Sequence, residues 1–398
     1  MQSLQISHYT LTSALGRGVA AHWEALQNER SGLRACDFDT CDLPAWIGRV
    51  DGVEDEKLNG AWSAHDGRNN RLAHIGLQQD GFAEAVLAAR ERYGAERIGV
   101  FLGTSTSGIY QTELAFRHRV PETGELPADF TYRHSQNCYS VGDFVRGYLG
   151  LQGPALVVST ACSSSAKVFA TASRYIASGL CDAAVVGGVD SLCLTTLYGF
   201  SSLQLVSPQP CRPADVDRNG ISIGEAAGFA LLEKAQDAEA IQLLGYGESS
   251  DAYHMSSPDP EGKGAALAMQ QALDKAGLNP QDIGYVNLHG TATPANDLSE
   301  GRAVAHIFGD DVPCSSTKGW TGHALGAAGI TETVICALAV EHGFLPRSLN
   351  TTRLDPDIPN RILMESLNSP IEAALTNSFG FGGSNCSLVI GRRRGGAA

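Results

Sequence analysis

Cys162 is the residue in this sequence whose position best suits a nucleophile. The apolar run 155–158 predicts a buried strand and 166–176 predicts a helix, with a turn of small residues between them. Cys162 therefore lies where a strand passes into a helix N-terminus. We expect the free backbone N–H groups and the positive end of the helix dipole to favour the thiolate there. A buried structural cysteine is the alternative for any cysteine considered alone.

Two histidines in the second half of the chain are candidates for hydrogen-bonding or acid–base chemistry. His289 directly follows a predicted strand and precedes Gly290 and small hydroxyl residues, a setting typical of a site rather than a packed core. His323 lies in a stretch of small residues between Lys318 and Glu332. That Lys–Glu pair can orient the imidazole and set its protonation, or can be a structural ion pair. A surface or core position is the alternative for His289.

A glycine-rich loop at 377–385 is the fourth candidate element. Its sequence, Asn-Ser-Phe-Gly-Phe-Gly-Gly-Ser-Asn, allows backbone N–H groups to come close to a substrate carbonyl. A tight turn that carries two core phenylalanines is the alternative. The loop lacks the GxGxxG spacing and a following helix, which excludes nucleotide binding at this point.

The elements that must position these groups recur in the same order in both halves of the chain. Each half contains a helix leading into a strand, a strand followed by a small-residue turn and helix, and a glycine-rich turn before a last strand. These blocks occupy 82–104, 156–177 and 224–232, and again 267–291, 312–340 and 379–390. Three matches in one order predict an internal duplication. A pseudo-two-fold axis between the halves would place Cys162 and His323 face to face.

Strands that alternate with helices predict an α/β fold with mostly parallel sheets covered by helices. We expect two related halves, 1–241 and 242–398, with the boundary in the polar stretch 234–241. Catalytic groups are expected at the strand ends where the halves meet. Residues 1–80 and 104–150 have weaker periodicity and are interpreted as insertions in the first half.

The composition is that of a globular protein of 398 residues, with 43% hydrophobic and 18% charged residues. The formal net charge of −14 argues against general nucleic-acid binding. With no apolar run near about 20 residues and no basic-then-apolar N-terminus, we expect a cytoplasmic protein without a membrane span. The ten cysteines form no CxxC pair, and Cys36 and Cys41 lack further ligands at metal-binding spacing, so we expect reduced thiols and no metal.

Taken together, the motifs resemble those of the β-ketoacyl-acyl-carrier-protein synthases, of the elongating Cys-His-His type within the thiolase superfamily. The motifs that carry the resemblance are Thr-Ala-Cys-Ser-Ser at 160–164, His-Gly-Thr-Ala-Thr at 289–293, Lys-Gly-Trp-Thr-Gly-His at 318–323 and Asn-Ser-Phe-Gly-Phe-Gly-Gly at 377–383. They follow the family's order over nearly the whole chain. The resemblance implies a thiolase-like fold, in which duplicated βαβαβ halves form a layered α-β-α-β-α sandwich.

The resemblance also implies a mechanism. Cys162 would take an acyl chain from the phosphopantetheine arm of an acyl carrier protein, with the backbone N–H groups of Cys162 and Phe381 as the oxyanion hole. His289 and His323, as neutral imidazoles, would donate hydrogen bonds to the thioester carbonyl of malonyl-acyl carrier protein and stabilise the enolate formed as CO₂ leaves. The enolate would attack the acyl thioester and give a β-ketoacyl chain two carbons longer. The carrier's arm is the only cofactor implied.

The resemblance assigns supporting roles to further residues. Lys318 and Glu332 would hold the geometry of His323, and Phe381 would be a gatekeeper beside the cysteine. The pocket for the substrate would be formed by Thr106, Thr291, Thr293, Phe379, Gly380 and Gly382.

The partners implied are an acyl carrier protein and a second chain. Arg68 and Arg71, on a predicted helix, would dock the acidic carrier, with a solvated helix face as the alternative. The second chain would be an identical copy, or a chain-length-factor-like homologue in a heterodimer of the polyketide or aryl-polyene type. Thr106 and Lys167 depart from the family pattern, which leaves open the acyl chain length and the choice between a fatty acid and a polyene pathway.

Three other functions in the same superfamily are weighed against this one. A non-catalytic chain-length-factor-like subunit lacks the nucleophile, whereas this chain has Cys162 with both histidines. A degradative thiolase needs a second catalytic cysteine in the closing loop, and 379–385 contains none. A starter-condensing synthase pairs its histidine with an asparagine, whereas the Thr-Gly-His motif here ends in His323.

Overall fold

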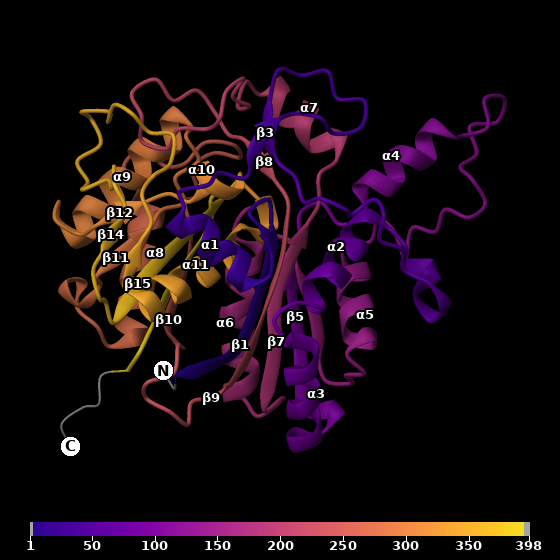
Figure 1. Ribbon diagram of the computed structural model, residues 1–398, viewed down its shortest axis with the longest axis horizontal. Helices are drawn as coiled ribbons and strands as arrows, with labels where there is room; N and C mark the ends of the chain where they lie inside the picture. Colours follow the sequence, from indigo (N-terminus) through magenta and orange to yellow (C-terminus); the bar gives the residue numbers. More distant parts are fainter. Residues whose placement is uncertain (1–2, 394–398) are drawn as a thin grey trace.

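The computed structural model describes residues 3–393, and an eleven-stranded mixed sheet runs through it (Figure 1). The first half of the chain contributes strands in the spatial order β1 (Leu4–Ser13), β9 (Ala226–Lys234), β7 (Ala183–Asp190), β5 (Ile98–Gly103) and β6 (Ala155–Val158). β5 is parallel to β6 and β7, whereas β9 is antiparallel to β7 and β1. The prediction of mostly parallel sheets is therefore wrong around β9. The chain between β7 and β9 returns at the same end of the sheet and does not cross it, so β9 runs in the opposite direction.

The second half of the chain repeats this topology. Its strands lie in the order β10 (Gln242–Ser250), β16 (Ser384–Gly391), β15 (Ala373–Gly380), β11 (Tyr285–Asn287) and β12 (Cys314–Ser315), with the same parallel and antiparallel senses. This match confirms the duplication. It also shows that the interpretation of 1–80 as an insertion is wrong for β1, which is the counterpart of β10. The segment 235–241 connects the two copies, at the boundary that we predict between 1–241 and 242–398.

Two buried helices, α6 (Ser164–Ala177) and α11 (Ala328–His342), lie between the two halves of the sheet and contact each other. Their apolar side chains form one hydrophobic core with the inward faces of both halves. The outer faces are covered by α2 (Arg68–Leu77), α3 (Phe82–Tyr93) and α5 (Tyr139–Tyr148) on the first half, and by α8 (Lys263–Ala276) and α9 (Pro294–Phe308) on the second. These layers confirm the predicted α-β-α-β-α sandwich.

The segment 325–342, which contains α11, is long and apolar enough to cross a membrane by length and composition, with a mean hydropathy of 1.2 over 18 residues. The expectation that no apolar run approaches such a length is therefore wrong here. In the folded chain 89% of this segment is buried. Its apolar character follows from its place between two sheets, because a helix covered on all sides has no polar face.

Shorter elements gather over one end of the sheet, at the top of Figure 1. They include helix α7 (Leu194–Ser202) and a small sheet made of β3 (Leu33–Ala35), β4 (Trp46–Gly48) and β8 (Ile223–Gly224). Helix α4 (Ile109–Arg117) and the loop after it extend away from the body. The remaining elements are α1 (Val19–Gln27), α10 (Lys318–Thr321), η1 (Gly60–His65), η2 (Ala95–Arg97), η3 (Pro280–Asp282), η4 (Leu325–Ala327), β2 (Gly16–Arg17), β13 (Phe344–Leu345) and β14 (Leu367–Asn368), where η marks a short 3₁₀ helix.

Strand β6 forms an open edge of the large sheet. It pairs with β5, and no other strand within residues 3–393 pairs with its outer side. Leu156 on this strand is 40% exposed. At the opposite end of the sheet, Cys314 of β12 bridges to Ile362, which shields that edge. The N–H and C=O groups on the outer side of β6 are therefore available to pair with another chain.

Candidate active site

The turn that carries Cys162 is sharply bent and held by hydrogen bonds. Ala161 before it has a φ of 52°, in the left-handed region that few non-glycine residues adopt. The Ser164 hydroxyl donates to the Ala161 carbonyl (2.6 Å) and accepts from the Thr160 N–H (2.9 Å). Helix α6 begins at Ser164, earlier than the predicted start at 166, so Cys162 lies directly ahead of the helix.

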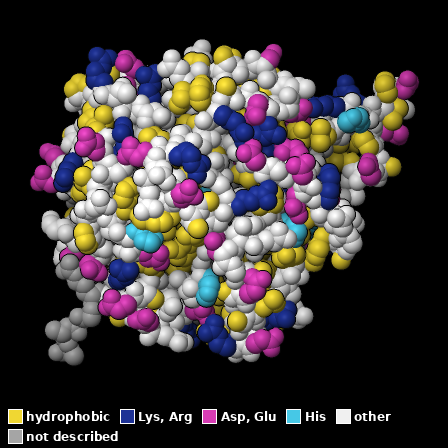
Figure 2. Space-filling model, in the orientation of Figure 1, with side chains coloured by type: hydrophobic (Ala, Val, Ile, Leu, Met, Phe, Trp, Pro, Cys, Tyr) yellow, Lys and Arg dark blue, Asp and Glu magenta, His cyan; other side chains and the backbone are white. Residues whose placement is uncertain are grey.

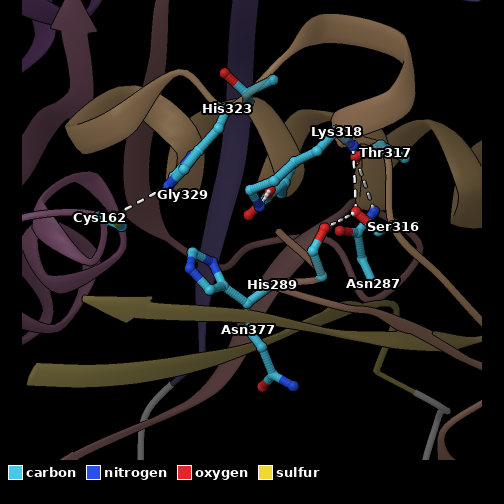
Figure 3. A network of polar contacts seen from close by, with 12 residues as sticks. Cys162, Asn287, His289, Ser316, Thr317, Lys318, His323, Gly329 and Asn377 are labelled. Carbon is cyan, nitrogen blue, oxygen red and sulfur yellow. Dashed lines mark hydrogen bonds and ion pairs between the residues drawn. The ribbon is translucent and has the colours of Figure 1, made fainter. Parts of the chain in front are cut away.

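His289 and His323 approach the same point as Cys162 from the second half of the chain (Figure 3). The Nε2 atom of His323 lies 3.1 Å from the Cys162 Sγ atom. The two imidazole rings stand edge to face, with centroids 5.3 Å apart and planes at 83°. The His323 N–H donates to the Ser222 carbonyl (2.7 Å), and the Gly224 N–H donates to the His323 carbonyl (2.9 Å). The structure thus brings together the three residues that the sequence places in one site.

A close contact between the two central helices makes this approach possible. A Cβ atom on Gly329 would lie 2.5 Å from the backbone nitrogen of Ala166, so only glycine lets the start of α11 reach the start of α6. The Ile330 N–H also donates to the Ser165 hydroxyl (3.0 Å). These contacts hold the segment with His323 beside the turn with Cys162.

Burial controls the protonation of the cysteine. It raises the pKa of the Cys162 thiol to about 11, although the Lys318 charge and a hydrogen bond from the Phe381 backbone N–H both lower it. The resting residue is therefore a neutral thiol at physiological pH. The expectation of a thiolate stabilised by the helix N-terminus is wrong, because the cost of burying a charge exceeds what the helix end provides.

Both histidines are neutral in the folded protein. Burial lowers the pKa of His289 and of His323 well below the usual value near 6.5, and the Lys318 charge lowers both further. A neutral imidazole can accept a proton from a thiol or donate a hydrogen bond to a carbonyl oxygen. The site is therefore prepared for proton transfer and for stabilising negative charge on oxygen.

Lys318 and Glu332 form a buried ion pair behind the histidines. Lys318 is 1% exposed, Glu332 is 2% exposed, and the ammonium donates to the carboxylate. Burial raises the pKa of Glu332 to about 7, against the lowering effect of Lys318. Within residues 3–393 no hydrogen bond joins either side chain to His323, so the pair acts on the site through its charge and packing.

The glycine-rich loop is the hairpin between β15 and β16. Its Phe381 backbone N–H donates to the Cys162 sulfur, and the oxyanion-hole role of this group stays a prediction. The Phe381 ring is 37% exposed and lies 5.6 Å from the Phe200 ring of α7, centroid to centroid. The Gly382 N–H donates to the Met255 carbonyl (2.7 Å), which ties the hairpin to the 251–258 loop. Phe381 therefore stands between solvent and the cysteine.

A cavity of about 260 Å³ contains the three reactive side chains. Most of the predicted pocket residues line it, namely Thr291, Thr293, Phe379, Gly380 and Gly382, together with Phe381. Thr106 does not. Its N–H and its hydroxyl both donate to the Asp190 carboxylate (2.8 Å each). Because Thr106 is expected to close the acyl pocket at the interface with a second chain, its pocket role stays a prediction. Lys167 also lies outside the lining, with its Nζ 3.9 Å from Glu248.

Sequence reasoning missed Glu300, which holds the backbone of His289. This buried carboxylate on α9 accepts hydrogen bonds from the N–H groups of His289 (2.7 Å) and Gly290 (2.8 Å) and from Asn377 (3.1 Å). Burial raises the pKa of Glu300 to about 7, although these hydrogen bonds lower it. Because Glu300 bonds to backbone groups, no pattern of residue types pointed to it.

The docking prediction is wrong for Arg68. This side chain is 3% exposed, and its guanidinium donates to the fully buried Glu225 carboxylate (2.6 Å). An arginine committed to an internal ion pair is not available to a partner. Arg71 donates twice to Asp66 (2.6 and 2.7 Å) and has a side chain that is 15% exposed. For Arg71 the docking role stays a prediction.

The cavity contains one set of potential metal ligands. The ligand atoms of Cys162, His289 and His323 all lie within 4.8 Å of one another. A divalent ion held by these atoms would occupy the sulfur and prevent it from acting as a nucleophile.

Comparison with known proteins agrees with this geometry. The models of the beta-ketoacyl synthase N-terminal and C-terminal domains match residues 9–238 and 241–352. The chain is 33% identical to 3-oxoacyl-(acyl-carrier-protein) synthase 2 of Vibrio cholerae serotype O1, over 96% of this chain and 97% of that protein.

Solved structures give the same result. One chain of the ketosynthase ApeO in complex with its chain length factor ApeC, from Xenorhabdus doucetiae, matches with a TM-score of 0.89 and 38% identity over 98% of each chain. The ishigamide ketosynthase/chain length factor matches with a TM-score of 0.88 and 26% identity over 98% of this chain and 99% of that one. With its cysteine, its two neutral histidines and both domain models matched, this chain belongs to the beta-ketoacyl synthase family.

Proposed function

We propose that this chain catalyses the decarboxylative condensation of an acyl group on Cys162 with malonyl-acyl carrier protein, giving a β-ketoacyl-acyl carrier protein. The observation that carries the proposal is the meeting of a buried thiol with two neutral imidazoles, one of them 3.1 Å from the sulfur. A named relative, 3-oxoacyl-(acyl-carrier-protein) synthase 2, supports the choice of carrier. The reaction needs no cofactor beyond the carrier's phosphopantetheine arm.

The first step transfers the acyl group to the enzyme. The Cys162 S–H donates to the His323 Nε2 atom, and the sulfur attacks the carbonyl of the incoming thioester as the proton moves to the imidazole. The N–H groups of Cys162 and Phe381 stabilise the tetrahedral oxyanion. Collapse breaks the bond to the pantetheine sulfur, which takes the proton from His323. The imidazole is neutral again when the acyl-enzyme has formed.

The second step makes the carbon–carbon bond. His289 and His323 donate hydrogen bonds to the thioester carbonyl of the malonyl group, for which the neutral His323 ring changes tautomer after the first step so that Nε2 carries its proton. The C–C bond to the carboxylate then breaks to release CO₂ and leave an enolate. The enolate carbon attacks the acyl-Cys162 carbonyl, and the Cys162 sulfur leaves as a thiolate that then takes up a proton from solvent. The buried positive charge of Lys318 lies close enough to lower the pKa of both imidazoles, so it also favours the enolate's negative charge.

The partners we propose are an acyl carrier protein and a second chain that pairs along β6. The second chain is either an identical copy or a homologue resembling a chain length factor, the kind of partner named for the ApeO ketosynthase. On the face seen in Figure 2, Lys and Arg side chains lie among Asp and Glu side chains. On such a mixed surface, an acidic carrier would be oriented by local groups of Lys and Arg side chains rather than by the overall charge of the protein. We place the protein in the cytoplasm.

The thiolase alternative is disfavoured by the closing hairpin. Its residues contain no cysteine, and Cys386, the next cysteine along the chain, is fully buried in β16 and does not line the cavity. Within the described residues, no second cysteine lines the cavity beside Cys162 that could act as a base or accept an acyl group. The geometry favours condensation with decarboxylation.

Mass spectrometry of the intact protein tests the proposal. We expect incubation with a panel of acyl-acyl-carrier-protein thioesters to add one acyl group, and subsequent malonyl-acyl carrier protein to remove it with release of CO₂. Cys162→Ala should abolish the adduct, while Cys211→Ala, which alters another buried cysteine, should retain it. An acyl adduct on the Cys162→Ala protein would refute the nucleophile assignment. An adduct that malonyl-acyl carrier protein leaves in place would refute the condensation.

A further inference from the structure

A second cluster of metal-ligating side chains lies outside the cavity, on the outer side of the first half. His65 ends η1, Asp143 lies on α5, and His134 lies in the loop between α4 and α5. Their ligand atoms all lie within 4.8 Å of one another, and none of the three residues lines the cavity with Cys162. We propose that His65, His134 and Asp143 form a structural site for one divalent transition-metal ion of the zinc type.

The distances between the ligand atoms fit a metal better than they fit hydrogen bonds. The His65 Nε2 atom lies 3.3 Å from Asp143 Oδ2 and 3.3 Å from His134 Nδ1. A tetrahedral zinc site with bonds of about 2.0–2.1 Å separates its ligand atoms by about 3.4 Å. A good N–H···O bond is shorter, at about 2.9 Å. The His65 Nε2 atom can also donate at most one hydrogen, although it has two neighbours at this distance. A single metal ion can instead accept a lone pair from each of the three ligand atoms.

Buried hydrogen bonds hold the two histidines in place. The Asn70 side chain donates to the His65 carbonyl (3.0 Å) and to the Ser140 hydroxyl (3.0 Å), and that hydroxyl donates to the His134 carbonyl (2.6 Å). Asn70 is 4% exposed and Ser140 is 3% exposed. This chain of bonds links the backbones of the two histidines through groups that are not ligands, so the site is preorganised.

The surroundings suit a zinc-type ion with one open position. His65 is 6% exposed, and its ring packs against Trp62 and Phe144, with centroids 5.7 and 6.4 Å away. The Asp143 side chain is 38% exposed, so an ion can enter from solvent and keep a water as its fourth ligand. Two imidazoles and one carboxylate favour Zn²⁺ and its neighbours over Mg²⁺ or Ca²⁺, which prefer all-oxygen sites.

A metal at this site would fasten α4 and the loop after it, which extend away from the body of the protein, to α5 and η1. The loop that carries His134 follows α4, and the Glu113 carboxylate of α4 accepts hydrogen bonds from the N–H groups of Leu194 (3.1 Å) and Thr195 (2.6 Å) in α7. Helix α7 also carries Phe200, the neighbour of the gatekeeper ring. The ion therefore stabilises a chain of contacts that reaches the mouth of the cavity without taking part in the chemistry.

Calorimetric titration of Zn²⁺ into the full-length protein tests the site. The parent protein should carry Cys162→Ala, which removes the thiol of the ligand set in the cavity. We expect one equivalent to bind tightly and to raise the melting temperature. His134→Gln and Asp143→Asn should each weaken Zn²⁺ binding at least about tenfold, because each change removes a ligand, and even the loss of a residue that only supports a ligand typically costs that much. The matched control is His118→Gln, an exposed histidine at the end of α4 that should bind like the parent.

Cobalt provides a second measurement that does not depend on stability. Co²⁺ bound at this site should show the visible bands of a four-coordinate ion without a thiolate charge-transfer band, and His134→Gln should remove those bands. The proposal is overturned if the parent binds no ion, or if both variants bind Zn²⁺ as the parent does. Each variant's circular dichroism spectrum confirms that it is folded before titration.

Discussion

The Nε2 atom of His323 lies 3.1 Å from the sulfur of Cys162, although 161 positions separate the two residues in the chain. Because burial lowers the pKa of His323 and raises that of the Cys162 thiol, the contact joins a neutral imidazole to a neutral thiol in the resting site. The first half of the molecule supplies the nucleophile and the second half supplies its proton acceptor.

The two histidines should differ in what their removal costs. His289→Ala should retain acylation of Cys162 and lose malonyl decarboxylation, because His289 makes no hydrogen bond to the sulfur in the described site. His323→Ala should lose decarboxylation and also slow acylation by about a hundredfold or more, the scale of general-base catalysis. Intact-mass kinetics measures acylation, and conversion of malonyl- to acetyl-carrier protein measures decarboxylation. Equal acylation rates in the two variants would contradict this assignment.

Alkylation of Cys162 should depend steeply on pH. Since only the thiolate reacts and burial raises the pKa of Cys162 to about 11, the iodoacetamide rate should rise by about tenfold per pH unit between pH 7 and 9. Peptide mapping separates Cys162 from the other nine cysteines. A rate that levels off below pH 8 would mean that the helix N-terminus or Lys318 stabilises a thiolate after all.

Glu300→Gln should damage the second half-reaction. The amide replaces one carboxylate oxygen with an NH₂ group, which cannot accept, so either the His289 or the Gly290 N–H group loses its acceptor and faces another donor. The loop should shift, and a small displacement of His289 costs on the order of a hundredfold in rate. Decarboxylation should therefore fall while Cys162 acylation is retained. Glu261→Gln, an exposed change, is the control and should leave both rates unaltered.

Arg68→Ala should lower stability and leave carrier affinity unchanged. It removes the partner of the fully buried Glu225, and breaking a buried pair from one side costs about 3–5 kcal/mol. Denaturant unfolding measures the free energy of unfolding, and titration with the carrier measures binding. Arg71→Ala, at a less buried pair, should cost less stability. Normal stability with weakened carrier binding in Arg68→Ala would restore the docking role.

The sequence predicted the parts of the site that depend on local structure. The turn at Cys162, the histidine after β11 and the glycine hairpin all follow from strand and helix patterns that are short in sequence. The duplicated order of blocks then placed Cys162 opposite His323. These predictions needed no knowledge of how the sheets pack.

What the sequence did not predict depends on tertiary contacts. Whether Cys162 is a thiol or a thiolate is decided by burial, which residue types around it do not reveal. Glu300 was missed because its carboxylate serves backbone N–H groups, and Arg68 was misread because Glu225, its partner, lies far along the chain. Thr106 bonds to Asp190 and does not line the cavity of the single chain, so its expected role at an interface with a second chain stays a prediction.

The open edge at β6 has a consequence for assembly in the cell. Backbone N–H and C=O groups are the same in every chain, so the edge by itself cannot tell a copy of this protein from a related one. Discrimination must come from side chains near the strand, such as the exposed Leu156. If a second chain pairs along β6 as we propose, two such chains made together in one cell would compete for the same edge. The relative amounts of like and unlike pairs then depend on expression levels as well as on complementarity.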